Sequence, residues 1–285
     1  MRHITSTPLL TVIAMFAFAA NSLLCRLALG DQQIDAASFA TVRVVSGAIT
    51  LSLFMLPHWG GGRRRAGFDW RAASMLFGYV IFFSFAYLSL SAGTGALLLF
   101  GSVQLTMIIA ALRSGEPFNI WSWAGLLLAV AGLVYLVSPG ITAPDPLGAG
   151  LMIVAGLAWG LYSLVGRRAG NPLESTANNF ILAAPMAIAV SILFIGDLHL
   201  STRGLLLAVA SGSVASGLGY VTWYAALKGL TSTRAATVQL SVPVIAAIGG
   251  VLMLAEPVTL RLVLASAATL GGIAMVLLQR TKRQH

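Results

Sequence analysis

Apolar residues along this chain are gathered into long runs, separated by short segments rich in glycine, proline and charged residues. A run of about 20 apolar residues is enough for a helix to cross the roughly 30 Å hydrocarbon core of a bilayer. Ten runs have this length, so the pattern predicts ten membrane-spanning helices. Their approximate bounds are 8–29, 35–56, 71–90, 92–112, 119–138, 148–169, 175–196, 204–227, 234–254 and 259–279.

The segments between these runs are too short to hold a soluble domain, and several carry turn residues, as at 138–140 and 171–172. The first run follows a basic residue, Arg2, and includes small residues at 17–19, as a cleavable signal peptide would. The run continues past that point, however, and a matching segment opens the second half of the chain. A first transmembrane helix is therefore expected rather than a signal peptide.

Composition also indicates a membrane protein. Of the 285 residues, 58% are hydrophobic and 9% are charged, whereas soluble domains are about 25% charged. The mean hydropathy is +0.90. Because so few charged residues cannot cover a water-exposed surface, the lipid bilayer is the expected partner of the apolar surface. Cys25 is the only cysteine, so no disulfide can form within the chain.

The net charge of +9 would suit a nucleic-acid-binding protein if the basic residues formed one stripe. They fall instead in small groups between the apolar runs, so no nucleic-acid partner is expected. With the N-terminus in the cytoplasm, only Arg203 and Arg261 face the outside, and thirteen basic residues face the cytoplasm. The thirteen are Arg2, Arg63, Arg64, Arg65, Arg71, Arg113, Arg167, Arg168, Lys228, Arg234, Arg280, Lys282 and Arg283. This distribution predicts that both termini are cytoplasmic, in agreement with an even number of helices.

The two halves of the chain align with each other. A shift of 140 residues matches Glu116-Pro117 with Glu256-Pro257, and a nearly constant offset continues over more than 100 residues. Chance similarity between two strings rich in leucine and alanine is the alternative. Each half holds five predicted helices, and an odd number makes the second half enter the membrane from the opposite side. We therefore expect residues 1–140 and 141–285 to form an inverted repeat, which is typical of alternating-access transporters.

These halves, each with a Glu-Pro between its fourth and fifth helices and then a glycine-rich helix, resemble the EamA-type members of the drug/metabolite transporter superfamily. The second half matches better, from 223–228 through Ser241-Val242-Pro243 to Gly271-Gly272. The first half has Val103 where the family has the proline that corresponds to Pro243. The resemblance covers nearly the whole chain and is strongest to the YddG branch of amino-acid exporters. It implies export of neutral or aromatic amino acids and related small metabolites across the bacterial inner membrane.

Motifs of energy coupling and catalysis are missing from the sequence. There is no G-x-x-x-x-G-K-[ST] phosphate loop, no H-E-x-x-H and no G-x-S-x-G. The histidines all lie in predicted tails or loops: His3, His58, His199 and His285. We therefore expect no enzyme activity, no cofactor, no catalytic residue and no metal site.

The acidic residues lie at or beyond the predicted helix ends. They are Asp31, Asp35, Asp69, Glu116, Asp145, Glu174, Asp197 and Glu256. Proton-coupled exporters of cationic drugs generally need an acid at membrane depth, so its absence predicts facilitative transport down the substrate gradient, with coupling through another group as the alternative. Glu116 and Glu256, each directly before a proline, are expected to complement the positive N-terminal ends of the fifth and tenth helices.

Arg43 lies about two turns inside the second predicted helix, with no acid at neighbouring helical positions. Two interpretations remain open: Arg43 binds a carboxylate of the substrate, or it snorkels to the outer interface or pairs with a carboxylate or helix end inside the protein. Arg26 and Arg167, near the ends of their helices, are expected to neutralise the negative C-terminal ends of those helices.

Polar and aromatic residues near the middle of the predicted helices are the candidate substrate contacts. Aromatic faces with a few amides and hydroxyls suit a zwitterion with an apolar side chain, and packing alone is the alternative for each aromatic residue. The candidates are Asn21, Tyr79, Phe83, Gln104, Trp159, Tyr162, Ser163, Tyr220, Trp223 and Gln239. Gly156 and Gly160 predict a close helix approach. The glycine-rich eighth helix and the ninth, with Pro243, are the expected moving parts, and static packing is the alternative.

Taken together, the sequence predicts an all-α membrane protein of ten transmembrane helices, arranged as a five-plus-five inverted repeat around a midplane cavity. Transport of small molecules by alternating access is the expected function. The alternatives are efflux of drug-like or other small metabolites, and a non-transporting scaffold or sensor. A monomer is one option for the oligomeric state.

Overall fold

The computed structural model describes residues 6–56, 67, 69–115, 118–166, 171–230 and 232–281. This part of the chain is helical throughout and has no named strand, apart from an isolated β-bridge between Ile34 and Leu200. Within it, nine helices are long and apolar enough to cross a membrane, and a tenth apolar helix, Trp70–Ala86, is shorter. The predicted all-α membrane fold is therefore confirmed.

The first half contains five continuous helices. They are α1 (Ser6–Gly30), α2 (Ala36–Met55), α3 (Trp70–Ala86), α4 (Ala92–Arg113) and α5 (Ile120–Val137). The second half is more broken. Its elements are α6 (Pro146–Gly166), α7 (Pro172–Leu193), the short turn η2 (Ile195–Asp197), α8 (Thr202–Val209), the π-helical segment η3 (Ala210–Leu218), α9 (Gly219–Leu227), α10 (Ser232–Gln239), α11 (Ser241–Leu254) and α12 (Leu260–Thr281).

Pro243 explains the interruption between α10 and α11. A proline has no N–H, and its ring clashes with the carbonyl four residues earlier, here that of Gln239. Accordingly α10 ends at Gln239, and the N–H of Leu240 bonds the carbonyl of Thr237 in a tighter turn, at 3.1 Å. The ninth span is therefore interrupted one helical turn before Pro243.

The eighth predicted span is a single rod made of α8, η3 and α9, with nine residues of π-helix at its centre. Such wide turns are rare and are found mostly at functional sites. Small residues allow η3 to lie directly on α2, because a side chain at Gly212 would collide with the backbone of Arg43. The density of glycine and serine thus brings two backbones into contact at the depth of Arg43.

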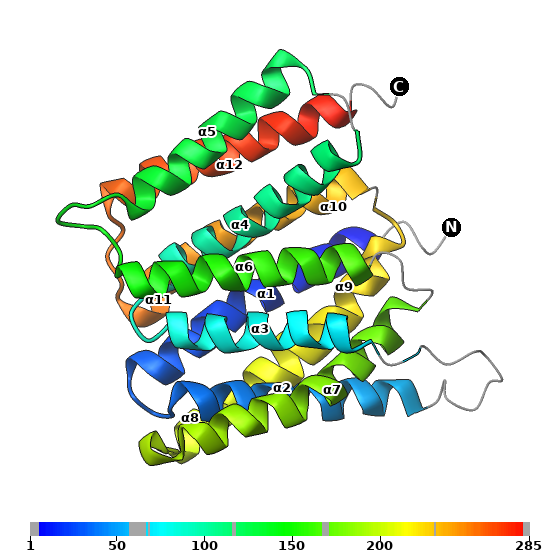
Figure 1. The fold of residues 1–285 in the computed structure, drawn as a ribbon, viewed down its shortest axis with the longest axis vertical. Helices are drawn as coiled ribbons and strands as arrows, with labels where there is room; N and C mark the ends of the chain where they lie inside the picture. The colour runs from blue at the N-terminus through cyan, green and yellow to red at the C-terminus, as the bar shows by residue number, and fades with distance from the viewer. Residues whose placement is uncertain are drawn as a thin grey trace.

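The helices run side by side and alternate in direction along the chain (Figure 1). We call the end where α1 begins and α12 ends the termini end, on the right in Figure 1, and the opposite end the far end. Connections at the far end comprise residues 31–35, 87–91, 138–145, 194–201 and 255–259. Polar caps satisfy the first backbone N–H groups of several helices, as Asp35 does for Ser38 at 2.8 Å.

Helices of the two halves pair with each other. α5 packs along α12, α2 along α7 and α4 along α11, while α6 lies against α3 and α4, and α1 lies against α9 and α11. The close approach predicted for Gly156 and Gly160 occurs between α6 and α4. A Cβ atom added at Gly156 would lie 2.6 Å from Cβ of Ser102, and one at Gly160 would lie 2.7 Å from Cβ of Thr106.

We expect Gly156→Ala to destabilise the protein and Gly150→Ala, on the same helix, to leave it unchanged or stabilise it. At Gly156 the new methyl would overlap α4, and such overpacking costs about 1–3 kcal/mol. At Gly150 nothing lies within 4 Å of the added atom, and alanine favours the helix by up to about 1 kcal/mol. Thermal unfolding of both variants in detergent measures the difference, and equal melting temperatures would contradict this packing.

Candidate functional site: the central cavity

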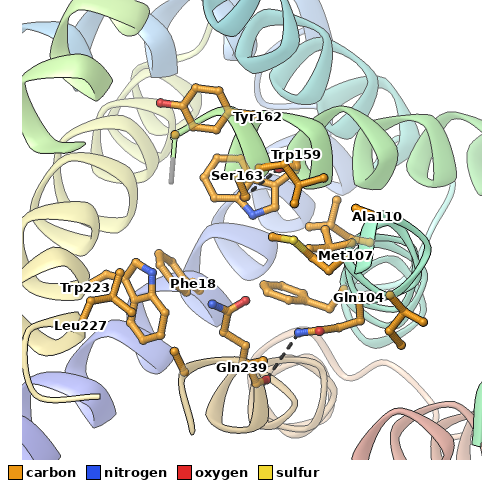
Figure 2. A pocket seen from close by; sticks show the side chains of 18 of the residues that line it. Phe18, Gln104, Met107, Ala110, Trp159, Tyr162, Ser163, Trp223, Leu227 and Gln239 are labelled. Carbon is orange, nitrogen blue, oxygen red and sulfur yellow. Dashed lines mark hydrogen bonds between the residues drawn. The ribbon is translucent and has the colours of Figure 1, made fainter. Parts of the chain in front are cut away.

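A cavity of about 1170 Å³ lies between the two halves of the molecule. Its wall is formed mainly by α1, α3, α4, α6, η3, α9 and α10. All ten candidate contact residues line it: Asn21, Tyr79, Phe83, Gln104, Trp159, Tyr162, Ser163, Tyr220, Trp223 and Gln239. Figure 2 shows Gln104 from the first half of the chain and Trp159, Trp223 and Gln239 from the second half facing this space. The sequence-based set therefore comes together around one volume, whereas Arg43 lies behind the wall.

An aromatic cluster centred on Trp159 forms one side of the cavity. The Trp159 ring is stacked on Tyr220, with centroids 5.4 Å apart and planes inclined by 22°. It also contacts Tyr79 at 4.8 Å and Tyr162 at 5.3 Å. Phe18, on α1, adds a further ring to the cluster, with its centroid 6.0 Å from that of Tyr220. Since aromatic side chains have few rotamers, these rings make a flat and rigid apolar wall.

Polar groups interrupt this wall at a few places. The hydroxyl of Ser163 donates to the carbonyl of Trp159 at 2.8 Å, and the amide of Gln104 donates to the carbonyl of Ala236 at 3.4 Å. The amide of Gln239 points into the cavity (Figure 2) and has no hydrogen-bond partner among the described residues. The cavity can therefore bind an apolar group along its aromatic side and polar groups at separate points.

Arg43 is fully buried on α2. Its Nη2 donates to the Tyr79 hydroxyl at 2.8 Å and its Nε donates to the Ser216 hydroxyl at 3.3 Å. The guanidinium lies over the rings of Phe83 and Tyr79, at 4.8 and 5.1 Å from their centroids. Nη1 has no partner, and no described carboxylate pairs with Arg43. Within the described chain, Arg43 therefore neither reaches the outer interface nor pairs with a carboxylate.

Arg26 and Glu256 form an ion pair at the far end of the molecule. Arg26 Nε lies 3.0 Å from Glu256 Oε1, and Arg26 Nη1 donates to the carbonyls of Tyr87 at 3.1 Å and Leu88 at 3.4 Å. Glu256 Oε2 accepts the N–H of Ala92, the first residue of α4, at 2.8 Å. This group of contacts, which we call the far-end latch, joins α1, the α3–α4 connection and the α11–α12 connection.

The latch corrects two expectations. Glu256 was expected at the N-terminal end of the tenth span. However, α12 begins at Leu260, and its cap is Thr259, whose Oγ1 accepts the N–H of Leu262 at 3.1 Å. Glu256 lies instead at the start of α4. Arg26 was expected to neutralise the end of its own helix, but it bonds carbonyls that follow α3. The corresponding expectations for Glu116 and Arg167 fall on residues outside the described part of the chain.

A second set of contacts ties the connections 31–35 and 194–201 together at the far end. Asp35 Oδ2 accepts the N–H of His199 at 3.2 Å, Ser201 Oγ donates to Gln33 at 2.9 Å, and Arg203 lies 3.3 Å from Asp31. The cavity lining includes no residue from any far-end connection, but it reaches the termini end at residues such as Ser114, Phe118, Gly166, Leu230 and Gln279. The cavity therefore extends to the termini end and is closed at the far end.

Several lining residues were not among the candidates. Phe18 shares a helical face with Asn21 and Ser22, spacings of three and four that the sequence does contain. Met107, labelled in Figure 2, is a similar case because it follows Gln104 by three residues. Gln279 and Ser114 had no such signal, since polar residues near helix ends are expected on any membrane protein. No cluster of three potential metal ligands occurs among the described residues.

A family model described as the EamA-like transporter family matches the chain twice, over residues 5–138 and 146–278. The chain belongs to the EamA-like transporter family. It is therefore a multi-pass membrane protein and a transporter, which disfavours the scaffold and sensor alternatives. The two matched segments correspond to the halves that the sequence offset defined.

Individual relatives of this EamA-like transporter support the same family. An uncharacterised protein of Pseudomonas aeruginosa is 51% identical over 278 residues, covering 97% of this chain and 96% of that protein. A threonine/homoserine exporter of Salmonella typhimurium is 32% identical over 173 residues, covering 58% of this chain and 57% of that protein. A solved crystal structure superposes with a TM-score of 0.69 at 21% identity, covering 96% of this chain and 98% of that one, which supports the fold.

Truncation of the central aromatic residue should weaken cargo binding by the EamA-like transporter. Trp159→Ala removes the ring stacked on Tyr220, and lost apolar contact of about 1–3 kcal/mol raises the half-saturating concentration roughly 5-fold to 150-fold. Trp121→Ala is the matched control, because Trp121 is 60% exposed on α5 and does not line the cavity. Transport kinetics and melting temperature are measured together. A well-folded Trp159→Ala protein with unchanged transport of every cargo would remove Trp159 from the binding surface.

Proposed function

We propose that this protein is a facilitative exporter of neutral or aromatic amino acids and related small metabolites across the bacterial inner membrane. The observation that carries the proposal is the cavity: it lies between the halves and combines an aromatic wall with separate polar groups. Its volume, about 1170 Å³, is slightly above the roughly 300–1,000 Å³ typical of small-molecule sites. The threonine/homoserine exporter among the relatives supports an amino-acid cargo, as does the resemblance to the YddG branch.

Alternating access through an inverted repeat is the proposed mechanism. The family model matches each half separately. Suppose that α1 is equivalent to α6, α3 to α9, and α4 to α11. In the first half, α3 and α4 then pack against α6 of the second half. In the second half, their equivalents α9 and α11 pack against α1, the equivalent of α6. Both packings are present. A pattern that is unchanged when equivalent helices are exchanged supports a pseudo-twofold arrangement, and the cavity between such halves is formed by a single chain, so a monomer suffices.

The termini end is proposed to face the cytoplasm, which makes the described conformation inward-facing. The basic residues support this orientation, since Arg71, Arg113, Lys228 and Arg234 lie at the termini end and cytoplasmic connections are enriched in lysine and arginine. Arg203 and Arg261, the two basic residues expected outside, lie at the far end. Of the other basic residues assigned to the cytoplasm, all except Arg280 lie outside the described residues. Release of cargo then requires that the far-end latch open and the termini end close.

The position of the acids supports facilitative transport. Every described carboxylate lies in a connection or in the first turn of a helix, and none lines the cavity. Efflux of larger drug-like molecules is the second candidate, favoured by the size and aromatic character of the same cavity. Competition between amino acids and planar apolar compounds for one labelled cargo separates the two candidates.

Flux through purified protein in liposomes tests the function. We expect counterflow of radiolabelled L-phenylalanine or L-threonine, driven by the cargo gradient alone, with no accumulation when only a pH step is imposed. Accumulation above equilibrium under the pH step would replace the facilitative mechanism by proton coupling. No flux of any amino acid, with efflux of apolar compounds retained, would favour the second candidate.

Loss of the far-end latch should make the cavity accessible from outside the cell. Each charge-assisted hydrogen bond contributes about 1.5–3 kcal/mol, so Arg26→Ala should shift the population towards the outward-open state by tenfold or more. A cysteine at Met107, in a Cys25→Ala background, reports the accessibility to an impermeant maleimide added to intact cells. Arg261→Ala is the control, because Arg261 bonds the carbonyls of Leu136 and Ser138, at the end of α5 and at the same end of the molecule. Equal labelling of the Arg26→Ala and Arg261→Ala proteins would contradict a gating role.

A further inference from the structure

The buried charge of Arg43 lacks a counter-charge in the described protein. The guanidinium is balanced only by two hydroxyl oxygens and two aromatic faces, and its Nη1 is unpartnered. A charge at membrane depth is costly unless it is paired, and such residues usually mark a substrate or ion pathway. The groups around Arg43 therefore need to be followed outward, atom by atom, to the cavity.

The Tyr79 hydroxyl connects Arg43 to the cavity. Its oxygen accepts a hydrogen bond from Arg43 Nη2 at 2.8 Å and another from Asn21 Nδ2 at 3.2 Å. Ser211, itself fully buried, donates to Asn21 Oδ1 at 2.5 Å, which turns Nδ2 of the same amide towards Tyr79. A phenol has two acceptor positions and one proton. With both acceptor positions occupied, the proton of Tyr79 is left to donate, and no described residue accepts it.

Ser216 and Asn21 present further donors beside Tyr79. The Ser216 oxygen accepts from Arg43 Nε at 3.3 Å, and no described acceptor takes its own proton. Asn21 uses one of its two N–H groups for Tyr79 and keeps the other. All three residues line the cavity. Its wall therefore has, at one place, three unused donors with a positive charge directly behind them and no carboxylate nearby.

We propose that Asn21, Tyr79 and Ser216, backed by Arg43, form a binding site for the carboxylate of the cargo. This inference rests on the proposed function and specifies its cargo as a small organic acid, including the zwitterionic amino acids. Arg43 does not touch the carboxylate. It is a positioning residue that polarises the Tyr79 and Ser216 hydroxyls, and its charge is balanced when the cargo is bound. The apolar part of the cargo then lies against Trp159, which contacts Tyr79 at 4.8 Å.

The test compares carboxylates with analogues that lack only the charge. Binding of L-phenylalanine, L-phenylalaninamide and L-phenylalaninol to the purified protein is measured by calorimetry, and benzoate and benzamide form a second pair. We expect the wild-type protein to prefer each carboxylate by roughly 10-fold to 150-fold, the range of a hydrogen bond to a charged group. Tyr79→Phe, which keeps the ring but not the hydroxyl, should reduce the preference to within about threefold by weakening carboxylate binding alone.

Tyr135→Phe is the matched control, because it removes a phenol hydroxyl outside the binding surface. Tyr135 lies on α5, is 42% exposed and does not line the cavity. The variant should keep the full preference for carboxylates. Arg43→Gln should lose the preference like Tyr79→Phe, and Arg43→Lys should restore part of it. If Tyr79→Phe fails to fold, Ser216→Ala serves in its place and is expected to reduce the preference for carboxylates as well.

Each outcome separates this site from the function on which it rests. A carboxylate preference that disappears in Tyr79→Phe and Arg43→Gln supports the site, whether or not flux is seen in liposomes. Flux of amino acids with equal affinity for acid and amide, or a preference that survives both substitutions, overturns the site and leaves the export function standing. Absence of binding by every carboxylate probe also overturns the site. A preserved preference without any flux argues against export alone.

Discussion

The hydrocarbon core of a bilayer offers no hydrogen-bond partner to a backbone group or a charge, and this constraint shapes the whole molecule. It favours continuous helices across the core, places side-chain caps where the helices begin, and confines charged residues to the two ends. Within the described spans, Arg43 is the one charged side chain that lies deep inside a helix. Its position therefore has to be explained by chemistry rather than by topology.

The constraint also explains where the backbone departs from regular helix. The break at Leu240 and the π-helical segment η3 both lie in the second half. Both border the cavity, since Gln239 beside the break and Ser216 of η3 line it. Backbone groups freed from regular pairing are tolerated at membrane depth where protein or a polar cavity covers them. The third and fourth spans of the first half, α3 and α4, are continuous. The two halves thus differ in the regularity of their helices.

Much of this architecture could be predicted because its causes are local. Length and apolar content define the spans, and Pro243 requires a break one turn before it. Residues of the cavity were found because polar and aromatic side chains in the middle of a membrane helix have few reasons to be there, as Asn21 and Gln104 illustrate. Phe18 was missed because one phenylalanine among many apolar residues carries no such signal, although its spacing from Asn21 placed it on the same face.

Contacts between distant segments could not be predicted in the same way. Glu256 lies before a proline, so a local explanation at the start of α12 was sufficient from sequence alone. Its actual partners, Arg26 and the N–H of Ala92, are 230 and 164 residues away. Such pairs depend on how the two halves meet, which neither half encodes separately. The same holds for Arg43, whose partner Tyr79 belongs to a different helix and whose partner Ser216 belongs to the other half.

The absence of an acid beside Arg43 has a consequence for selectivity. One carboxylate in the wall would cancel the positive charge of Arg43 and leave the cavity neutral. More than one carboxylate would make the cavity attractive to cations. Instead the described acids stay at the helix ends, and hydroxyls and ring faces surround the guanidinium. At an effective dielectric constant of about 20, a carboxylate about 6 Å from an arginine gains roughly 3 kcal/mol, and a cation loses as much. If Asn21, Tyr79 and Ser216 bind the carboxylate as proposed, the cavity discriminates between cargo charges through the residue type that its described wall lacks, as well as through those that it contains.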